Sequence, residues 1–278
     1  MICFPNAKIN IGLNIVEKRD DGYHNIETIF YPVLLSDALE VVTAKKTTLQ
    51  MSGLPVAGDP QNNLVCKAYA LLKNDFQLPE ISIFLHKNIP LGGGLGGGSS
   101  DGVFMLRLLN DYFSLALTSE QLIHYASQLG SDCAFFVQNK PAYASQRGEE
   151  ITLIDLDLSA YSIVIIKPNV HISTTEAYRS IVPLKPSMSL TSLIQLPVNE
   201  WKYFIVNDFE AVMFSKWPLL KEIKKLLYQQ GALYASMTGS GSAIYGIFPL
   251  EHFINLPVTN SFVWHHSLSI KMKGCHSG

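Results

Sequence analysis

A glycine-rich stretch from Pro90 to Ser100 carries the clearest chemical signal in the sequence. Six of the seven positions from 92 to 98 are glycine, although each glycine inside a regular element costs about 0.5–1 kcal/mol relative to alanine. An alternating stretch, 81–85, precedes it, and a mostly apolar stretch, 103–109, follows with N-cap residue types at 99–101. Backbone N–H groups between a strand and a helix start, together with the helix dipole, create a site for anions. The stretch therefore predicts a polyphosphate site.

Two other interpretations of the glycines remain open. Gly92, Gly94 and Gly97 satisfy the G-x-G-x-x-G pattern of dinucleotide-binding folds. With Asp111 as a candidate ribose ligand, the chain would then be an NAD-binding oxidoreductase, although Pro90 interrupts the junction of strand and loop. A flexible linker is the second alternative, but linkers rarely lie between a strand and a buried helix. A Walker A loop is excluded, because no G-K-[S/T] follows.

Lys8 and Asn10 stand side by side on the polar face of an expected strand over residues 6–16. Apolar residues alternate with them, and the polar face of such a strand is ordinarily solvated. An Asp-Gly turn signal follows the strand, and Tyr23 and His24 come at the tip of that turn. These two rings either pack back on the protein or offer a stacking and hydrogen-bonding surface for a base.

Asp132 lies directly before an apolar stretch, in Gly-Ser-Asp-Cys-Ala-Phe-Phe at 130–136. A capping box at 118–121 opens the preceding helix and Gly130 ends it, so Asp132 stands at the start of a second helix. A role as N-cap is sufficient to explain an aspartate at this place. A functional carboxylate is the alternative, and both interpretations stay open at this point.

The composition is that of a soluble enzyme. With 278 residues, 47% of them hydrophobic, the chain is long enough for one large domain or two. A net charge of −2 gives no electrostatic sign of a nucleic-acid or anionic-membrane partner. No apolar run approaches the roughly 20 residues of a membrane helix, and the first residues lack the plan of a signal peptide. The four cysteines lack zinc-type spacing. We therefore expect a cytoplasmic protein with neither nucleic acid nor membrane as a partner.

The succession of elements predicts two domains, 1–157 and 158–278, because the pattern changes after residues 151–154. In the second part, strands and helices follow the order β-α-β-β-α-β of ferredoxin-like domains, with a less regular connection over 183–197. Beyond the segments above, we expect strands over residues 26–35, 39–43, 47–52, 81–87, 161–167, 232–237, 243–248 and 262–265, and helices over 62–76, 173–181, from about 207, 218–230 and 250–256.

Three motifs together resemble those of the GHMP small-molecule kinases. They are Pro-Asn-Ala-Lys-Ile-Asn at 5–10, the doubled triple glycine with its flanks at 90–100, and Met-Thr-Gly-Ser-Gly-Ser-Ala at 237–243. The resemblance spans the chain from Pro5 to Phe248. It implies an α+β fold of two domains: an N-terminal domain like domain 2 of ribosomal protein S5 and a ferredoxin-like C-terminal domain. The active site would lie in the cleft between them.

Within that family, Ala-Lys-Ile-Asn, Asp-Gly-Tyr-His and Gly-Ser-Asp-Cys-Ala-Phe-Phe are similar to the members that act on 4-(cytidine 5′-diphospho)-2-C-methyl-D-erythritol. The resemblance implies that ATP phosphorylates the 2-hydroxyl of this cytidine-diphospho sugar alcohol, in non-mevalonate isoprenoid precursor biosynthesis. Mg²⁺ is implied as well, because the metal neutralises charge on the transferring phosphoryl group. A kinase for mevalonate, homoserine or a sugar, and a non-catalytic nucleotide-binding protein, are the alternatives.

The resemblance also implies roles for single residues. Asp132 matches the catalytic base, Lys8 its partner, and Asn10 a residue that orients the acceptor. No acidic residue is identified as a magnesium ligand, although Ser100 is a candidate by its place in the loop, and Asn207–Glu210 matches a family element without an assigned role. The residues that match the cytidine pocket are Tyr23, His24, Thr174 and Tyr178; those that match the ATP site are Lys87, near the adenine, and Pro90, Leu91, Gly92, Gly93, Gly94, Leu95, Gly96, Gly97, Gly98, Ser99 and Ser100.

Overall fold

The computed structural model describes residues 1–278 apart from 57, 180, 251, 253–255, 257 and 267–278. The strands are β1 (Ile2–Cys3), β2 (Asn6–Lys18), β3 (His24–Ser36), β4 (Ala38–Thr43), β5 (Thr48–Gly53), β6 (Ile81–Lys87), β7 (Ala142–Ser145), β8 (Glu150–Leu153), β9 (Tyr161–Pro168), β10 (Tyr234–Met237), β11 (Ile244–Pro249) and β12 (Ser261–His265). The helices are α1 (Leu64–Phe76), α2 (Gly97–Tyr112), α3 (Ser119–Leu129), α4 (Cys133–Gln138), α5 (Thr174–Arg179), α6 (Leu190–Leu193), α7 (Trp201–Phe204), α8 (Phe209–Lys216) and α9 (Pro218–Gln229), with the 3-10 helices η1 (Pro60–Asn62) and η2 (Val198–Glu200).

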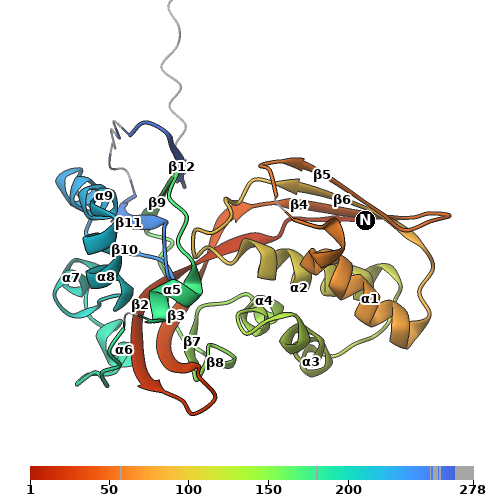
Figure 1. The fold of residues 1–278 in the computed structure, drawn as a ribbon, viewed down its shortest axis with the longest axis horizontal. Coiled ribbons are helices and arrows are strands. Elements are labelled where there is room, and N and C mark those ends of the chain that lie inside the picture. The colour runs from red at the N-terminus through yellow and green to blue at the C-terminus, as the bar shows by residue number, and fades with distance from the viewer. Residues whose placement is uncertain (57, 180, 251, 253–255, 257, 267–278) are drawn as a thin grey trace, which may run out of the picture.

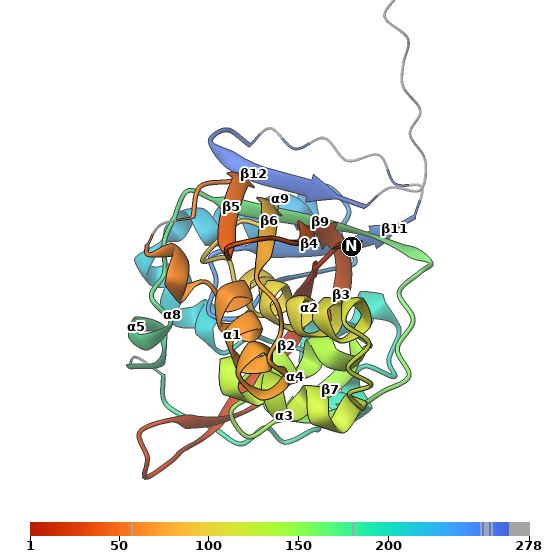
Figure 2. The same ribbon diagram turned by 90° about the vertical axis from the view of Figure 1, so that its right-hand side faces the viewer.

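Within these residues the strands form three four-stranded sheets, in the orders β1-β4-β6-β5, β2-β3-β7-β8 and β10-β11-β9-β12. Figure 1 shows the first sheet with α1 and α2 on one side of the molecule and the third sheet with α8 and α9 on the other. The long β2–β3 hairpin runs between the two groups. In Figure 2, α1 and α2 again lie beneath β4 and β6, so these helices cover one face of the first sheet. The chain thus places one hairpin between two separately layered halves.

The expected strand over residues 6–16 is confirmed as β2, and its polar face is not solvated as such a face ordinarily is. Residues 6–15 are buried without exception. Ile9 and Ile11 pack in one hydrophobic cluster with Trp201 and Tyr245 from the C-terminal half. The glycine loop pairs with the edge of β2 through Lys8 N and Leu95 O at 3.0 Å, and it also covers the polar face, because a Cβ on Gly96 would lie 3.1 Å from Lys8 Cγ. Burial on both faces places the polar side chains of β2 inside the molecule, where each needs a specific partner.

The start of α2 also differs from the sequence-based expectation. The helix begins at Gly97 with Gly96 as its N-cap, three residues before the expected cap at 99–101. Gly96 has φ +71°, a conformation that glycine adopts without strain and other residues rarely do. Ser100 and Asp101 are therefore buried inside the first turns of α2 instead of capping it. The capping box at Thr118, in contrast, is confirmed, with both of its hydrogen bonds formed.

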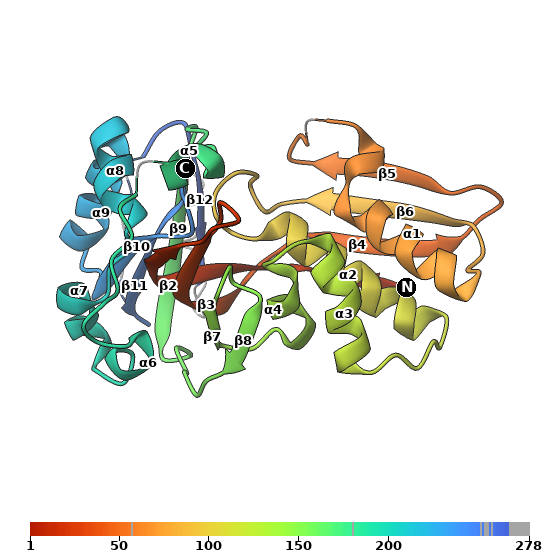
Figure 3. The same cartoon turned by 60° about the horizontal axis from the view of Figure 1, so that its bottom comes forward.

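The four strands expected in the C-terminal half are confirmed, and they form one antiparallel sheet in the order β10-β11-β9-β12. β11 pairs with β10 and β9, β9 also pairs with β12, and all of these pairs are antiparallel. Figures 1 and 3 show α8 and α9 together on the outer side of β10 and β11. The helices α6 and α7 were not expected within and after the irregular connection, and the expected helix over 250–256 falls largely outside the described residues. The domain division at residue 157 stays a prediction.

No helix in the part of the chain that the structure describes is long and apolar enough to cross a membrane.

Candidate active site

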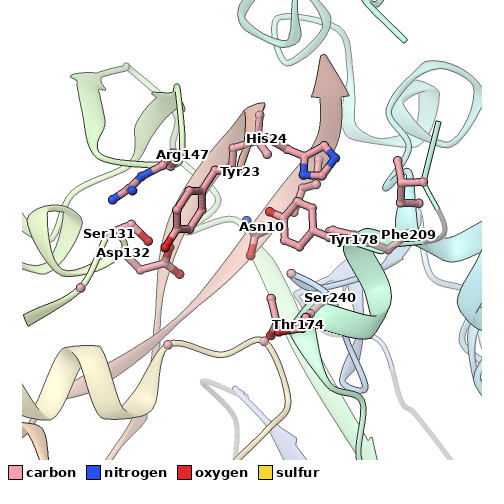
Figure 4. A pocket seen from close by; sticks show the side chains of 18 of the residues that line it. Asn10, Tyr23, His24, Ser131, Asp132, Arg147, Thr174, Tyr178, Phe209 and Ser240 are labelled. Atoms are coloured by element: carbon pink, nitrogen blue, oxygen red, sulfur yellow. The ribbon is translucent and has the colours of Figure 1, made fainter. Parts of the chain in front are cut away.

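A cleft of about 840 Å³ lies where the β2–β3 hairpin, the glycine loop, α5 and the turn at 239–241 meet. Figure 4 shows Asn10 in its middle, with Tyr23, Asp132 and Arg147 on one side and His24 and Tyr178 on the other. Of the residues that the sequence singled out, the structure brings together here Lys8, Asn10, Tyr23, His24, Gly94, Gly96, Asp132, Thr174 and Tyr178.

Lys8, Asn10 and Asp132 form the polar centre of the cleft. Lys8 Nζ donates to Asn10 Oδ1 at 2.5 Å and lies 3.6 Å from Asp132 Oδ2. Lys8 is 3% exposed, whereas the Asp132 side chain is 37% exposed, so the carboxylate is the member of the pair that faces the cleft. Burial lowers the pKa of Lys8, and the nearby Asp132 carboxylate opposes that shift.

Asp132 is free for this contact because it does not cap the helix that follows. It occupies the N-cap position of α4, as the sequence predicted, but its side chain makes no capping hydrogen bond. The carboxylate instead points toward Lys8. A carboxylate that is partly exposed, next to a buried ammonium, can accept a proton from a hydroxyl held in the cleft.

Thr238 joins the three sequence motifs at one hydroxyl group. Its Oγ1 accepts a hydrogen bond from Asn10 N at 3.0 Å and donates to Gly94 O at 3.0 Å. A Cβ on Gly94, which has φ +72°, would lie 2.0 Å from the Thr238 carbonyl oxygen, so this crossing admits only glycine. Sequence reasoning missed Thr238, although it follows Met237 at the start of the third motif.

The glycine loop is held between the two halves of the chain. The carbonyls of Gly92 and Gly93 accept hydrogen bonds from Ser242 N and Ala243 N, both at 3.3 Å. Gly98, one residue into α2, would meet nothing within 4 Å if it carried a Cβ, so open space lies over the start of this helix. An anion placed there would face the N-terminus of a sixteen-residue helix, α2.

The Lys87 side chain does not line this cleft, and its expected place near the adenine stays a prediction. Lys87 is 2% exposed, and its ammonium donates to the carboxylates of Asp37 and Asp101. Asp37 also accepts from Ile89 N at 2.8 Å, so the cluster fixes the chain where it leaves β6 toward the loop. Burial raises the pKa of Asp101 to about 8, with Lys87 opposing the shift and Asp37 adding to it. The contacts of Lys87 with Asp37 and Asp101 therefore stabilise the segment that leads from β6 into the glycine loop.

Aromatic rings line the part of the cleft beyond its polar centre. The rings of His24 and Tyr178 stack with centroids 5.1 Å apart and planes 26° apart, and Phe209 meets the edge of Tyr178. Burial, assisted by the Lys18 ammonium, lowers the pKa of His24, so its imidazole is neutral at pH 7. Tyr23 is 57% exposed on the opposite side. These rings offer flat apolar faces and one imidazole to a planar ligand.

Asn207–Glu210, which the sequence left without a role, holds the turn at 239–241 in place. Asn207 Nδ2 donates to Met237 O at 2.8 Å and to Gly239 O at 2.9 Å. Asp208 Oδ2 accepts from Ile15 N at 2.7 Å, and Glu210 Oε1 accepts from Met237 N at 2.8 Å. The segment thus ties the third motif to β2, and its role is to position the cleft wall.

Comparison with known proteins gives consistent matches. Residues 63–140 match the model described as GHMP kinases N terminal domain, and residues 199–255 match GHMP kinases C terminal. A protein of Bacteroides fragilis named 4-diphosphocytidyl-2-C-methyl-D-erythritol kinase is 52% identical over 91% of this chain and 94% of its own length. A protein of Bacteroides thetaiotaomicron with the same name is 54% identical over 90% of this chain and 93% of its own length.

Solved structures agree. A crystal structure of a 4-(cytidine 5′-diphospho)-2C-methyl-D-erythritol kinase is 30% identical, with a TM-score of 0.77 over 89% of this chain and 90% of that one. A homoserine kinase from Cytophaga hutchinsonii is 16% identical, with a TM-score of 0.65 over 95% of both chains, and shares the fold.

Proposed function

The chain belongs to the 4-diphosphocytidyl-2-C-methyl-D-erythritol kinases of the GHMP family, and from this membership we propose how its cleft carries out the reaction. It is a small-molecule kinase that uses ATP. It moves the γ-phosphoryl group of ATP to the 2-hydroxyl of 4-diphosphocytidyl-2-C-methyl-D-erythritol, in isoprenoid precursor biosynthesis. One observation carries the assignment of roles: the Lys8–Asp132 pair and the His24–Tyr178 stack line the same cleft.

Asp132 acts as the general base for the acceptor hydroxyl. Its exposed carboxylate accepts the hydroxyl proton while the acceptor oxygen forms its bond to the γ-phosphorus and the bond to the β-phosphate oxygen breaks. Lys8 stabilises the carboxylate and the charge that develops on the acceptor oxygen, because its ammonium lies 3.6 Å from Asp132 Oδ2. Asn10, held by Thr28 Oγ1 at 3.0 Å, orients the acceptor.

The cytidine of the acceptor occupies the aromatic end. Tyr178, Tyr23 and His24 supply the stacking faces, and the neutral His24 ring supplies one donor and one acceptor for the edge of the base. Thr174, whose Oγ1 lies 3.3 Å from Ser240 Oγ, closes this end of the pocket. An acceptor without a base leaves these faces unused, which favours the cytidine conjugate over mevalonate or homoserine.

The glycine loop, residues 90–100, and the first turn of α2 hold the phosphates of ATP. Ser100 Oγ is buried without a hydrogen-bond partner, so phosphate or Mg²⁺ at the loop would supply the partner that it lacks. No group of three or more His, Cys, Asp or Glu side chains suited to a metal occurs among the described residues, so phosphates and water would provide most ligands of Mg²⁺. The metal would neutralise charge on the transferring phosphoryl group.

A cytoplasmic location accords with these features. Cys3, Cys66 and Cys133 are free thiols, as is usual in a reducing compartment. The net charge of −2 gives no reason to expect nucleic acid as a partner.

An ADP-release assay over a panel of acceptors tests the proposal directly. We expect rapid turnover with the cytidine-diphospho alcohol and at most slow turnover with mevalonate, homoserine or a free sugar alcohol. Faster phosphorylation of one of the latter would reject the acceptor, and binding of NADH in place of ATP would reject the reaction class.

A further inference from the structure

The cleft carries more positive than negative side chains. Among its described lining residues, Lys8, Lys18, Arg147 and Arg179 are cationic and Asp132 alone is acidic. Lys8 and Asp132 compensate each other, since they lie 3.6 Å apart. The other three leave a surplus of positive charge in a recess, which attracts anionic ligands. In the proposed acceptor, the anionic group is the diphosphate between the cytidine and the sugar alcohol.

Arg147 lies beside Tyr23, on the side of the cleft that also holds Asp132. Its guanidinium carbon lies 4.5 Å from the centroid of the Tyr23 ring, which is a cation–π contact. The next residue, Gly148, packs against the base, because a Cβ on it would lie 3.5 Å from Asp132 Oδ1. Figure 4 shows Arg147 and Tyr23 beside Ser131 and Asp132. A diphosphate that connects a cytosine stacked on Tyr23 to a hydroxyl at Asp132 would therefore lie near the Arg147 guanidinium.

The backbone around Arg147 is fixed by its neighbours. Gln146 O accepts from Ile26 N at 2.6 Å, and Gln146 Oε1 accepts from Arg19 Nη1 at 3.1 Å. Glu149 Oε2 accepts from the backbone N of Arg147 at 2.8 Å. The turn that carries Arg147 is therefore tied to the same hairpin that carries Tyr23.

The guanidinium itself keeps its donors available. Its Nε lies 3.7 Å from Glu149 Oε1, and both side chains are more than a third exposed, so this ion pair is weak. No oxygen in the described part of the chain accepts a hydrogen bond from the guanidinium. The other unpaired cations are less well placed: Lys18 and Arg179 are exposed at the ends of β2 and α5.

We propose that Arg147 binds the diphosphate of the acceptor and so sets the distance between its base and its reacting hydroxyl. This inference rests on the proposed function. A planar guanidinium donates two parallel hydrogen bonds to phosphate oxygens, which an ammonium cannot do. The stack on Tyr23 holds the guanidinium in place before the acceptor arrives, and this lowers the entropy lost on binding.

Competition between cytidine and CDP against the acceptor tests the proposal in Arg147→Gln. We expect the inhibition constant of CDP to rise about ten- to a hundredfold, as for loss of hydrogen bonds to a charged group. The constant for cytidine should change less than twofold, and the KM for ATP should not change. Arg147→Lys, which keeps the charge but not the fork, should give an intermediate loss for CDP.

Arg107→Gln is the matched control, because Arg107 also lies over an aromatic ring, with its guanidinium carbon 5.0 Å from the Phe104 centroid, but outside the cleft. It should leave both constants unchanged. Equal weakening of cytidine and CDP in Arg147→Gln would mean that Arg147 acts only through Tyr23, and this would overturn the proposal. Unchanged CDP binding would also overturn it. If Arg147→Gln does not fold, the inhibition constant of CDP for Arg147→Lys is the deciding measurement, and a value equal to wild type would overturn the proposal. Turnover of the wild-type protein with the cytidine-diphospho alcohol tests the proposed function independently of these ratios.

Discussion

Replacement of Asp132 by asparagine is the sharpest test of the catalytic assignment. The carboxamide keeps the shape of the side chain but cannot accept a proton, so kcat should fall by about 10²–10⁴, which corresponds to about 3–5 kcal/mol in the barrier. The folded state should lose little. Asp132 is 37% exposed and its pairing is screened by water, while Lys8 retains its 2.5 Å hydrogen bond to Asn10, so we expect at most about 1 kcal/mol of destabilisation.

An ADP-release assay gives kcat, and calorimetric titration with ATP together with thermal unfolding gives affinity and stability. Asp111→Asn is the informative control, because a dinucleotide-binding fold would need Asp111 as its ribose ligand, whereas it lies at the far end of α2 from the cleft. We expect this control to behave as wild type. Turnover of Asp132→Asn within tenfold of wild type would refute the role of Asp132 as base. A parallel loss of ATP affinity and stability would show that Asp132 is structural.

Three further predictions follow from the geometry. Because burial lowers the pKa of Lys8, its ammonium loses the proton below the usual 10.5, and the pH profile of kcat/KM should fall on the alkaline side before that pH. Gly94→Ala places a Cβ 2.0 Å from the Thr238 carbonyl oxygen at φ +72°, and should lower stability by about 1–3 kcal/mol and raise the KM for ATP. Gly98→Ala, in the first turn of α2 with nothing within 4 Å of the new Cβ, should unfold at or slightly above the wild-type temperature, because alanine favours a helix more than glycine does. Tyr178→Ala should raise the KM for the acceptor about ten- to a hundredfold, because one stacked base contributes roughly 1–3 kcal/mol. In the wild-type protein, CMP should inhibit more strongly than UMP, and equal inhibition by the two would contradict cytosine recognition.

Local patterns in the sequence were sufficient for the parts of the site that depend on neighbouring residues. The Asp-Gly turn predicts a hairpin tip, and Tyr23 and His24 do lie at the end of the β2–β3 hairpin. The glycines predict a loop before a helix, and the loop does precede α2. The helix start was misplaced because serine and aspartate are common N-caps, whereas here Gly96 caps the helix in a left-handed conformation that no side-chain pattern announces.

Contacts between distant segments were beyond such patterns. The alternation in β2 is typical of a strand with one solvated face, but the C-terminal half and the glycine loop bury both of its faces. These contacts come from distant segments, so the sequence of residues 6–16 alone could not predict them. Lys87 ends a strand and precedes the loop, and this place in the sequence suits a ligand-binding lysine as well as a structural one. Only its burial against Asp37 and Asp101, 50 and 14 residues away, shows that it stabilises the start of the loop.

The buried polar contacts also explain why the two halves of the chain must stay in one arrangement for catalysis. Thr238 from the C-terminal half bonds to Asn10 N and to Gly94 O, so one hydroxyl fixes the acceptor-orienting strand and the phosphate loop relative to each other. Asn207 in turn holds the carbonyls of Met237 and Gly239. Thr238 and Asn10 are buried, so a substitution that removes the Thr238 hydroxyl would leave Asn10 N unpaired away from water, at a cost of about 1–3 kcal/mol. Donor and acceptor are therefore aligned by hydrogen bonds across the halves, which a change in either motif alone would break.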